Sequence, residues 1–366
     1  MSYHLGFGCM RLPMKGKQVN YDEFNKMIDY FMENGFHYFD TAHGYIDGLS
    51  EKAIGDCLSS RYPRESFELT NKLTGPYFKK EEDIRPFFEK QLKTCGVEYF
   101  DYYLMHAQDK DNYPHFQKCH AYEIGSQLKK EGKIKHLGLS FHDSAEFLDQ
   151  ILTEHPEIEI VQIQLNYLDY ESPAVQSRKC YEVCRKHKKD VLIMEPVKGG
   201  ALANLPEDAK KVFDSINPGK NYSAASYAIR FAAGLEGVYQ VLSGMSNLEQ
   251  MKDNVSYMKD FVPISKEEEE AIHKVVGILN SLGGIPCTAC RYCVEGCPMH
   301  IPIPDLFSCY NAKKVYDDWN SSMYYDIVTK DQGKASSCIE CGQCEGVCPQ
   351  HLKIREYLKE VSEIFD

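Results

Sequence analysis

The chain has 366 residues, of which 43% are hydrophobic, so it can build a packed core and global disorder is excluded. With 42 Lys and Arg against 54 Asp and Glu, its formal net charge of −12 argues against a nucleic-acid-binding protein, which normally presents a basic face. No run of about 18 apolar residues is present and the first residues do not resemble a secretory signal. We therefore expect a cytoplasmic protein that does not enter a membrane.

Eight short apolar segments alternate with amphipathic stretches over most of the chain. The apolar segments are residues 5–8, 36–40, 67–72, 101–106, 135–140, 161–166, 191–196 and 238–244. Alternating strands and helices indicate a parallel sheet, and eight such units predict an α/β fold with a (β/α)8 TIM barrel. A doubly wound sheet is the alternative, but no G-x-G-x-x-G motif follows the first segment.

Polar residues stand at the ends of three consecutive predicted strands, where TIM barrels build their active sites: Asp40, Lys72 and His106. Tyr45 follows in the loop after Asp40 and precedes a short helix that we expect Ser50 to cap. Reduction of a carbonyl leaves an alkoxide that needs a proton, and a tyrosine can supply it if its pKa falls from about 10. We expect Lys72 to lower the pKa of Tyr45 by stabilising the phenolate, Asp40 to keep Lys72 charged, and His106 to orient the carbonyl oxygen.

The barrel segment is predicted to end near residue 282. Residues 264–282 read as an amphipathic helix with Ser265 as its N-cap, and Gly283-Gly284-Ile285-Pro286 ends it. We therefore predict two domains, a barrel over residues 1–282 and a smaller domain over residues 283–366.

Eight of the 15 cysteines form two runs of identical spacing in the smaller domain. The runs are Cys287-x2-Cys290-x2-Cys293-x3-Cys297-Pro298 and Cys338-x2-Cys341-x2-Cys344-x3-Cys348-Pro349. This spacing is similar to the bacterial ferredoxin run that binds [4Fe–4S] clusters. The odd cysteine total and the missing signal argue against a disulfide framework.

In two-cluster ferredoxins the fourth cysteine of each run ligates the other cluster. The first cluster is thus predicted to take Cys287, Cys290, Cys293 and Cys348, and the second Cys338, Cys341, Cys344 and Cys297. Structural zinc is the alternative, but zinc sites usually combine two cysteine pairs and fit these runs poorly. We expect a small, mostly helical, ferredoxin-like iron–sulfur domain.

The strand-end residues also carry a family resemblance. The segments Phe39-Asp40-Thr41-Ala42-x-x-Tyr45, Thr70-x-Lys72-Leu73 and Leu104-x-His106 resemble the aldo/keto reductase family over residues 1 to about 260. The whole chain is similar to ferredoxin-fused members. The resemblance implies a (β/α)8 barrel, a nicotinamide cofactor bound without a Rossmann fold, a small-molecule carbonyl or alcohol substrate, and a catalytic tetrad of Asp40, Tyr45, Lys72 and His106.

The resemblance further implies a set of cofactor-binding residues. Ser140 and Gln162 match the residues that bind the nicotinamide carboxamide. The remaining matches lie at the end of the first strand and in the phosphate and adenosine segment: Gly8, Cys9, Met10, Gly244, Ser246, Asn247, Gln250 and Asn254. The lysine and arginine that hold the 2′-phosphate of NADP in many members are absent here, and Lys252 is the only nearby cation. NADP and NAD both stay open.

A nicotinamide delivers two electrons as a hydride, whereas a [4Fe–4S] cluster moves one electron at a time. Three hypotheses follow. In the first, clusters and barrel exchange electrons with each other or with a redox partner protein, through a flavin or an organic substrate. In the second, the barrel is an ordinary carbonyl reductase and the clusters are structural. In the third, the barrel is idle and the chain is an electron-transfer or interaction subunit.

Overall fold

The computed structural model describes residues 4–219, 221–287, 289–348 and 350–366, which fold into two compact units. The first unit comprises the chain up to Asn166 with Lys179–Val197 and Tyr222–Ile264, and the second comprises Tyr167–Arg178, Lys198–Asn221 and Ser265–Asp366. The domain limits at residues 282 and 283 remain a prediction.

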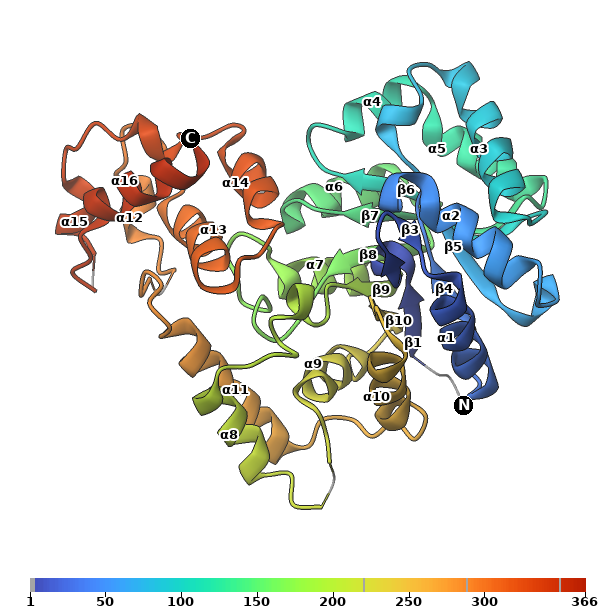
Figure 1. Ribbon diagram of the computed structural model, residues 1–366. Coiled ribbons are helices and arrows are strands. Elements are labelled where there is room, and N and C mark those ends of the chain that lie inside the picture. Colours follow the sequence, from blue (N-terminus) through green and yellow to red (C-terminus); the bar gives the residue numbers. More distant parts are fainter. Residues whose placement is uncertain (1–3, 220, 288, 349) are drawn as a thin grey trace. The chain divides into compact units, whose positions relative to one another are not determined.

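The first unit contains a closed barrel of eight parallel strands, as predicted (Figure 1). In chain order the strands are β1 (Leu5–Gly8), β4 (Tyr38–Asp40), β5 (Glu68–Leu73), β6 (Phe100–Gln108), β7 (Ile134–Phe141), β8 (Ile160–Gln164), β9 (Asp190–Met194) and β10 (Val238–Ser243). β1 closes the barrel by pairing with both β4 and β10. A two-stranded antiparallel hairpin, β2 (Met14–Lys15) with β3 (Gln18–Val19), lies outside this sheet. The doubly wound alternative is therefore wrong.

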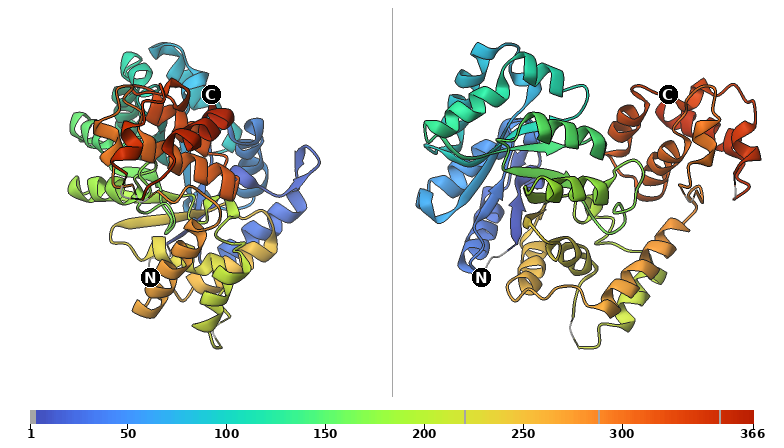
Figure 2. Two further views of the ribbon diagram at one scale, coloured as in Figure 1. Left: turned by 90° about the vertical axis from the view of Figure 1, so that its left-hand side faces the viewer. Right: turned by 180° about the vertical axis from the view of Figure 1, so that it is seen from behind.

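Helices surround the strands of the first unit (Figure 2). They are α1 (Tyr21–Glu33), α2 (Leu49–Ile54), α3 (Glu81–Cys95), α4 (Tyr113–Lys118), α5 (Ala121–Lys130), α6 (Ala145–Glu154), α9 (Ala224–Ala233) and α10 (Leu248–Met258), while α7 (Ser177–Lys186) has residues in both units. Side-chain caps begin several of them, because a side-chain oxygen accepts a backbone N–H that the helix leaves unpaired. Asn20 caps α1 and Ser223 caps α9 in this way.

Apolar side chains fill the barrel interior rather than a channel. Tyr38, Tyr102, Leu104, Ile160, Leu192 and Leu242 form one buried cluster there. At Gly138 of β7 a Cβ would lie 2.6 Å from the Ile160 carbonyl oxygen, so only glycine lets the chain pass at this point. The packed interior leaves the strand ends as the place for polar side chains.

The second unit is helical in its described part. Its helices are α8 (Glu207–Ser215), α11 (Lys266–Asn280), α12 (Tyr292–Glu295), α13 (Ile303–Tyr316), α14 (Ser321–Thr329), α15 (Gln343–Gly346) and α16 (Ile354–Phe365). Ser265 caps α11, as predicted, and Glu268 completes a capping box. Leu306, Phe307, Tyr325 and Leu358 are among the residues of its own hydrophobic core.

A buried charge cluster joins three segments of the second unit. The Lys198 ammonium donates to both carboxylate oxygens of Asp169, at 2.8 and 2.9 Å, and to Asp318 at 2.8 Å. Each of these side chains is at most 7% exposed. Removing one member would leave an uncompensated buried charge, so the cluster fixes these segments to one another.

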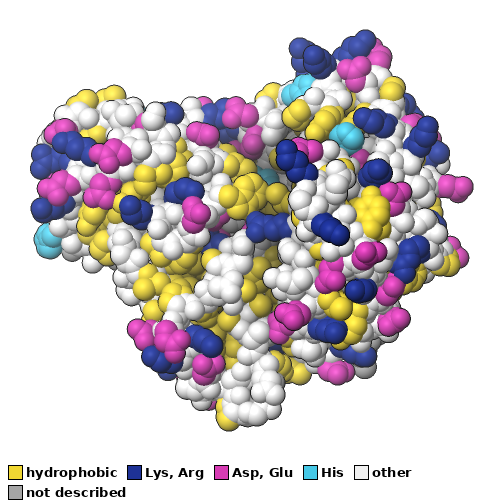
Figure 3. Space-filling view, in the orientation of Figure 1, with side chains coloured by type: hydrophobic (Ala, Val, Ile, Leu, Met, Phe, Trp, Pro, Cys, Tyr) yellow, Lys and Arg dark blue, Asp and Glu magenta, His cyan; other side chains and the backbone are white. Residues whose placement is uncertain are grey.

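Over the visible face of the molecule, acidic and basic side chains are interspersed (Figure 3). Within the described residues, we find no helix whose length and hydropathy suit a membrane span.

Candidate functional site

Three of the four predicted catalytic residues share one buried ion-pair system at the carboxyl ends of β4 and β5. The Lys72 Nζ atom lies 2.7 Å from Asp40 Oδ1 and donates a second hydrogen bond to the Thr41 carbonyl oxygen at 2.9 Å. The same nitrogen lies 4.8 Å from the centre of the Tyr45 ring. Lys72 and Asp40 have side chains that are only 1% and 3% exposed.

Lys72 is held in its charged form. Burial alone would lower its pKa, but the attraction of the Asp40 carboxylate, followed by that of Tyr45, raises the pKa of Lys72 above its ordinary value. The site therefore presents a fixed ammonium beside a phenol.

Tyr45 differs from the prediction in its acidity. Burial raises the pKa of the Tyr45 hydroxyl, the Lys72 charge acts in the opposite direction, and the net direction is upward. The expected fall of this pKa is therefore wrong for the structure, because the desolvation of the hydroxyl could not be read from the sequence. The hydroxyl is held protonated, which is the form that can donate a proton to an alkoxide.

His106 completes the group from β6. Its ring centre lies 6.1 Å from that of Tyr45, at an interplanar angle of 79°, and its Nδ1 bonds to the Thr74 hydroxyl at 2.7 Å. Pairing between β6 and β7 is irregular between Met105 and Gln108, and such bulges re-aim side chains near active sites. Burial, followed by the charge of Lys72, lowers the pKa of His106 well below its usual range, so the imidazole is neutral.

Ser140 and Gln162 lie side by side, since they are register partners on β7 and β8. The Ser140 hydroxyl accepts a hydrogen bond from the Ala107 amide, one residue beyond His106, at 2.7 Å. Gln162 is 2% exposed, and its Oε1 has no hydrogen-bond partner among the described residues. A buried, unpaired amide oxygen fits the amino group of a carboxamide, as the nicotinamide ring carries.

The three predicted residues at the end of β1 occupy different environments. Gly8 pairs in register with Asp40, which places it next to the ion pair. Cys9 is fully buried, and its carbonyl oxygen accepts from the Ser50 hydroxyl at 2.8 Å. Ser50 therefore does not cap its helix, which begins at Leu49 after Gly48 without a side-chain cap. Met10 is 38% exposed.

The predicted phosphate and adenosine residues gather around the start of α10. Asn247 Oδ1 accepts from the Gln250 amide at 2.9 Å, and Gln250 Oε1 accepts from the Ser246 amide at 2.7 Å. The Ser246 hydroxyl donates to the Arg11 carbonyl oxygen at 2.8 Å. Asn254 accepts from Ser243 Oγ at 2.6 Å. The structure thus brings the segment together as a preformed turn.

Two charged groups that the sequence analysis did not single out border this segment. Glu23 of α1 accepts from the Leu248 amide at 3.0 Å, so a carboxylate already takes one of the first amides of α10. The Arg11 side chain lies beside Gly244, since a Cβ at Gly244 would be 3.7 Å from Arg11 Cδ. The Arg11 guanidinium lies 3.5 Å from Glu195 Oε1. Lys252, the expected cation, lies instead over the ring of Tyr30.

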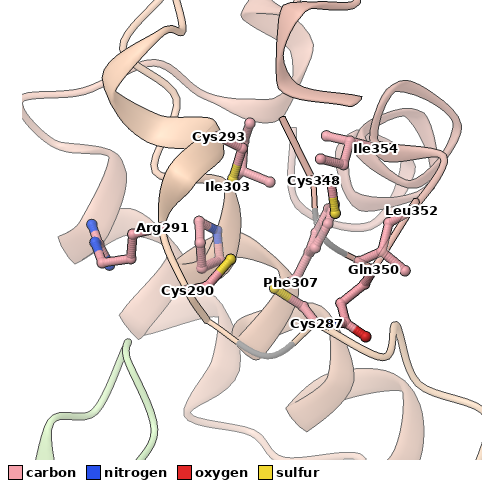
Figure 4. A pocket seen from close by; sticks show the side chains of 11 residues that line it. Cys287, Cys290, Arg291, Cys293, Ile303, Phe307, Cys348, Gln350, Leu352 and Ile354 are labelled. Atoms are coloured by element: carbon pink, nitrogen blue, oxygen red, sulfur yellow. The ribbon is translucent and has the colours of Figure 1, made fainter. Parts of the chain in front are cut away.

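The cysteines surround two separate pockets in the second unit. The first is lined by three cysteines of the first run and the last cysteine of the second run: Cys287, Cys290, Cys293 and Cys348. Their sulfur atoms face a common space (Figure 4), and Ile303, Phe307 and Ile354 form its apolar wall. The second pocket is lined by Cys338, Cys341, Cys344 and Cys297. The grouping is the crossed one that the spacing predicts.

Each pocket is lined by four cysteines and by apolar side chains, and part of it is open to solvent. Within the described ranges, no three His, Cys, Asp or Glu side chains are placed to hold one metal ion. Four cysteines in the ferredoxin-type spacing fit an iron–sulfur cluster better than zinc.

Comparison with known families gives two matches. The sequence model of the aldo/keto reductase family matches residues 4–276, and that of the 4Fe-4S dicluster domain matches residues 286–353. A similar protein, described as an uncharacterized oxidoreductase, YqkF, of Bacillus subtilis, is 23% identical over 69% of this chain and 85% of its own length. The NADH-specific methylglyoxal reductase of Escherichia coli is 25% identical over 61% of this chain and 78% of its own.

Solved structures resemble the barrel. The holo form of the aldo-keto reductase AKR11C1 from Bacillus halodurans aligns with a TM-score of 0.61 at 24% identity, over 74% of this chain and 91% of its own. An aldo-keto reductase from Klebsiella pneumoniae in complex with NADPH aligns with the same score at 18% identity, over 75% and 90%. At these identities the likeness shows the fold.

Proposed function

Because the chain belongs to the aldo/keto reductase family, we propose that its barrel reduces a small-molecule carbonyl, or oxidises the matching alcohol, with a nicotinamide cofactor. The observation that carries the proposal is the buried arrangement of Lys72 between the Asp40 carboxylate and the Tyr45 ring, with the His106 ring beside it. This arrangement supports the transfer of one proton to a carbonyl oxygen.

The reduced nicotinamide, when bound, supplies a hydride to the carbonyl carbon. Tyr45 donates its proton to the carbonyl oxygen as negative charge develops there, and Lys72 stabilises the phenolate that remains. Asp40 keeps Lys72 charged and fixed. The neutral His106 imidazole orients the carbonyl oxygen through a hydrogen bond, while Thr74 holds the other ring nitrogen. Ser140 and Gln162 would hold the carboxamide of the nicotinamide.

We propose that the cofactor is NADH in preference to NADPH. Recognition of a 2′-phosphate usually takes Arg or Lys, whereas a carboxylate suits a ribose hydroxyl. Here Glu23 accepts a hydrogen bond from the Leu248 amide. Positions 244 and 250 carry Gly and Gln rather than Lys or Arg. Arg11 is nearby but faces Glu195.

The eight cysteines of the two pockets would hold two [4Fe–4S] clusters, which supply one-electron storage when bound. We propose that they pass electrons to or from a redox partner protein. Supporting this, Cys290 and Cys341 are exposed, and so are the apolar side chains beside them, Tyr292 and Ile339 at 65% and 60%.

The test is anaerobic turnover with nicotinamide deuterated at C4 and a panel of aldehydes. Direct hydride transfer places deuterium on the carbinol carbon of the product. Loss of the deuterium to water, with bleaching of the cluster absorption, would show that electrons reach the substrate by another route. No consumption of any aldehyde with either nicotinamide would contradict the proposal.

A further inference from the structure

The backbone turns left-handed at three consecutive residues directly after Tyr45. Ile46 has φ 51° and ψ 46°, Asp47 has φ 53° and ψ 38°, and Gly48 has φ 85°. Glycine adopts this region freely, but a non-glycine residue there costs about 1–3 kcal/mol and persists only where its surroundings hold it. The β-branched Ile46 is the least suited of the three.

Two side-chain hydrogen bonds cross this turn from one flank to the other. Thr41 Oγ1 lies 2.7 Å from Ser50 Oγ, and since Ser50 donates to the Cys9 carbonyl oxygen, Thr41 is the donor of the pair. His43 Nδ1 lies 2.6 Å from Glu51 Oε2. The loop before Tyr45 is thus tied to the helix after the turn at two places.

The His43 ring is held by packing as well as by its hydrogen bond. Tyr77 and Phe87 meet it edge-on, with ring centres 4.6 and 5.1 Å away. The His43 side chain is 13% exposed and that of Glu51 is fully buried. A buried carboxylate is stable only with several donors, so Glu51 needs more partners than one imidazole.

These further partners lead to Lys72. Glu51 Oε1 accepts from Asn71 Nδ2 and from Gln91 Nε2, both at 2.9 Å. Asn71 Oδ1 in turn accepts from the Lys72 amide at 2.8 Å, and Gln91 Nε2 also lies 3.1 Å from the Lys72 carbonyl oxygen. One carboxylate therefore connects the loop that carries Tyr45 with both sides of the Lys72 backbone.

We propose that Glu51 and His43 are positioning residues that form a clamp, which holds the Tyr45 hydroxyl at its working distance from the Lys72 ammonium. This inference rests on the proposed function, because it assigns the clamp to the proton donor of that reaction. Neither residue touches the substrate in this account. They act by fixing the position of the left-handed turn relative to β5, the strand that carries Lys72.

The kinetic test compares His43→Phe, which keeps the ring packing but loses Nδ1, with Glu51→Gln, which keeps an oxygen for Asn71 and Gln91. A misplacement of about 1 Å can cost about 100-fold in rate, so we expect His43→Phe to lower kcat about 10- to 100-fold with KM changed less than about 3-fold. Glu51→Gln should lose less, because the Lys72 side of the clamp survives. Glu81→Gln is the matched control, since Glu81 makes an exposed 2.7 Å pair with His120.

The pH profile separates positioning from general damage. Tyr45 is surrounded by the charges of Lys72, Asp40 and Glu195, of which only Lys72 lowers its pKa. Moving Tyr45 away from Lys72 therefore raises that pKa. In a plot of the reduction rate against pH, the fall of the rate at alkaline pH (the alkaline limb) should therefore shift to higher pH in His43→Phe. Partial unfolding would lower the rate without moving the limb.

A crystal structure of the His43→Phe holoprotein gives a readout independent of turnover. We expect Tyr45 to move by about 1 Å or more relative to Lys72, with Ile46 leaving the left-handed region. The clamp would be overturned if Tyr45 does not move and if kcat and its dependence on pH are the same as in the wild type. If the wild type reduces no carbonyl, the proposed function fails, while this structure still decides whether the clamp holds Tyr45.

Discussion

Replacing Asp40 with asparagine removes the carboxylate that balances the most deeply buried ammonium of the barrel. Lys72 Nζ is 2.7 Å from that carboxylate, and the neutral groups that remain as its partners include the Thr41 carbonyl oxygen at 2.9 Å and the Tyr45 hydroxyl. Breaking one partner of a buried ion pair costs about 3–5 kcal/mol. At about 2–4 °C per kcal/mol for a domain of this size, Asp40→Asn should lower Tm by about 6–20 °C.

The same variant has a predicted pH signature. Without Asp40, burial lowers the pKa of Lys72, so a smaller fraction of Lys72 is protonated at pH 8 than at pH 6. We expect kcat for aldehyde reduction to fall at least about 10-fold at pH 8 and to recover partly as the pH falls to 6. Both pH values lie where the neutral His106 does not change its charge, because its pKa is well below the usual value.

Anaerobic thermal unfolding and steady-state reduction measure both effects on the same preparation. The control is the double variant Asp40→Asn with Lys72→Met, which has no unpaired ammonium and should be more stable than Asp40→Asn alone. A Tm within about 2 °C of the wild type, with kcat unchanged at pH 8, would refute the ion pair as a buried and functional one.

Three further predictions concern the other sites. Cys297→Ala should lose the cluster of the pocket formed mainly by the second cysteine run; iron analysis and EPR that show loss of the other cluster would refute crossed ligation. Lys198→Met leaves Asp169 and Asp318 facing each other, so it should cost the second unit about 3 kcal/mol or more in urea unfolding, and an unchanged midpoint would contradict the buried cluster. Glu23→Lys replaces a carboxylate with a cation and should tighten 2′-phospho-ADP-ribose binding at least about 10-fold relative to ADP-ribose by calorimetry; an equal effect on both ligands would count against NADH preference.

Much of the architecture could be predicted because it depends on local pattern. Short apolar runs between amphipathic stretches predicted eight strands, and Ser265 as an N-cap marked the start of α11. The residue types at the ends of β4, β5 and β6 likewise pointed to one site. Residues that face the same barrel mouth meet there whatever the details of the loops.

Other features depend on contacts between distant residues, which no local pattern reveals. The pKa of Tyr45 was predicted to fall, but it rises because desolvation of the hydroxyl outweighs the effect of the Lys72 charge. The partners of Glu51, at positions 71 and 91, are 20 and 40 residues away, and Asp318 reaches Lys198 across 120 residues. His43 lies two residues before Tyr45 and Thr74 two residues after Lys72, and this closeness to predicted catalytic residues was the only signal that could have found them.

The central claim is that the Tyr45 hydroxyl delivers the proton in carbonyl reduction. Tyr45→Phe removes one oxygen and leaves the ring, and NADH affinity and iron content can be measured on the same anaerobic preparation as turnover. We predict that kcat falls at least about 100-fold, as expected for loss of a general acid, while NADH binding and both clusters are retained. Reduction of every accepted aldehyde at the wild-type rate by Tyr45→Phe would contradict the account.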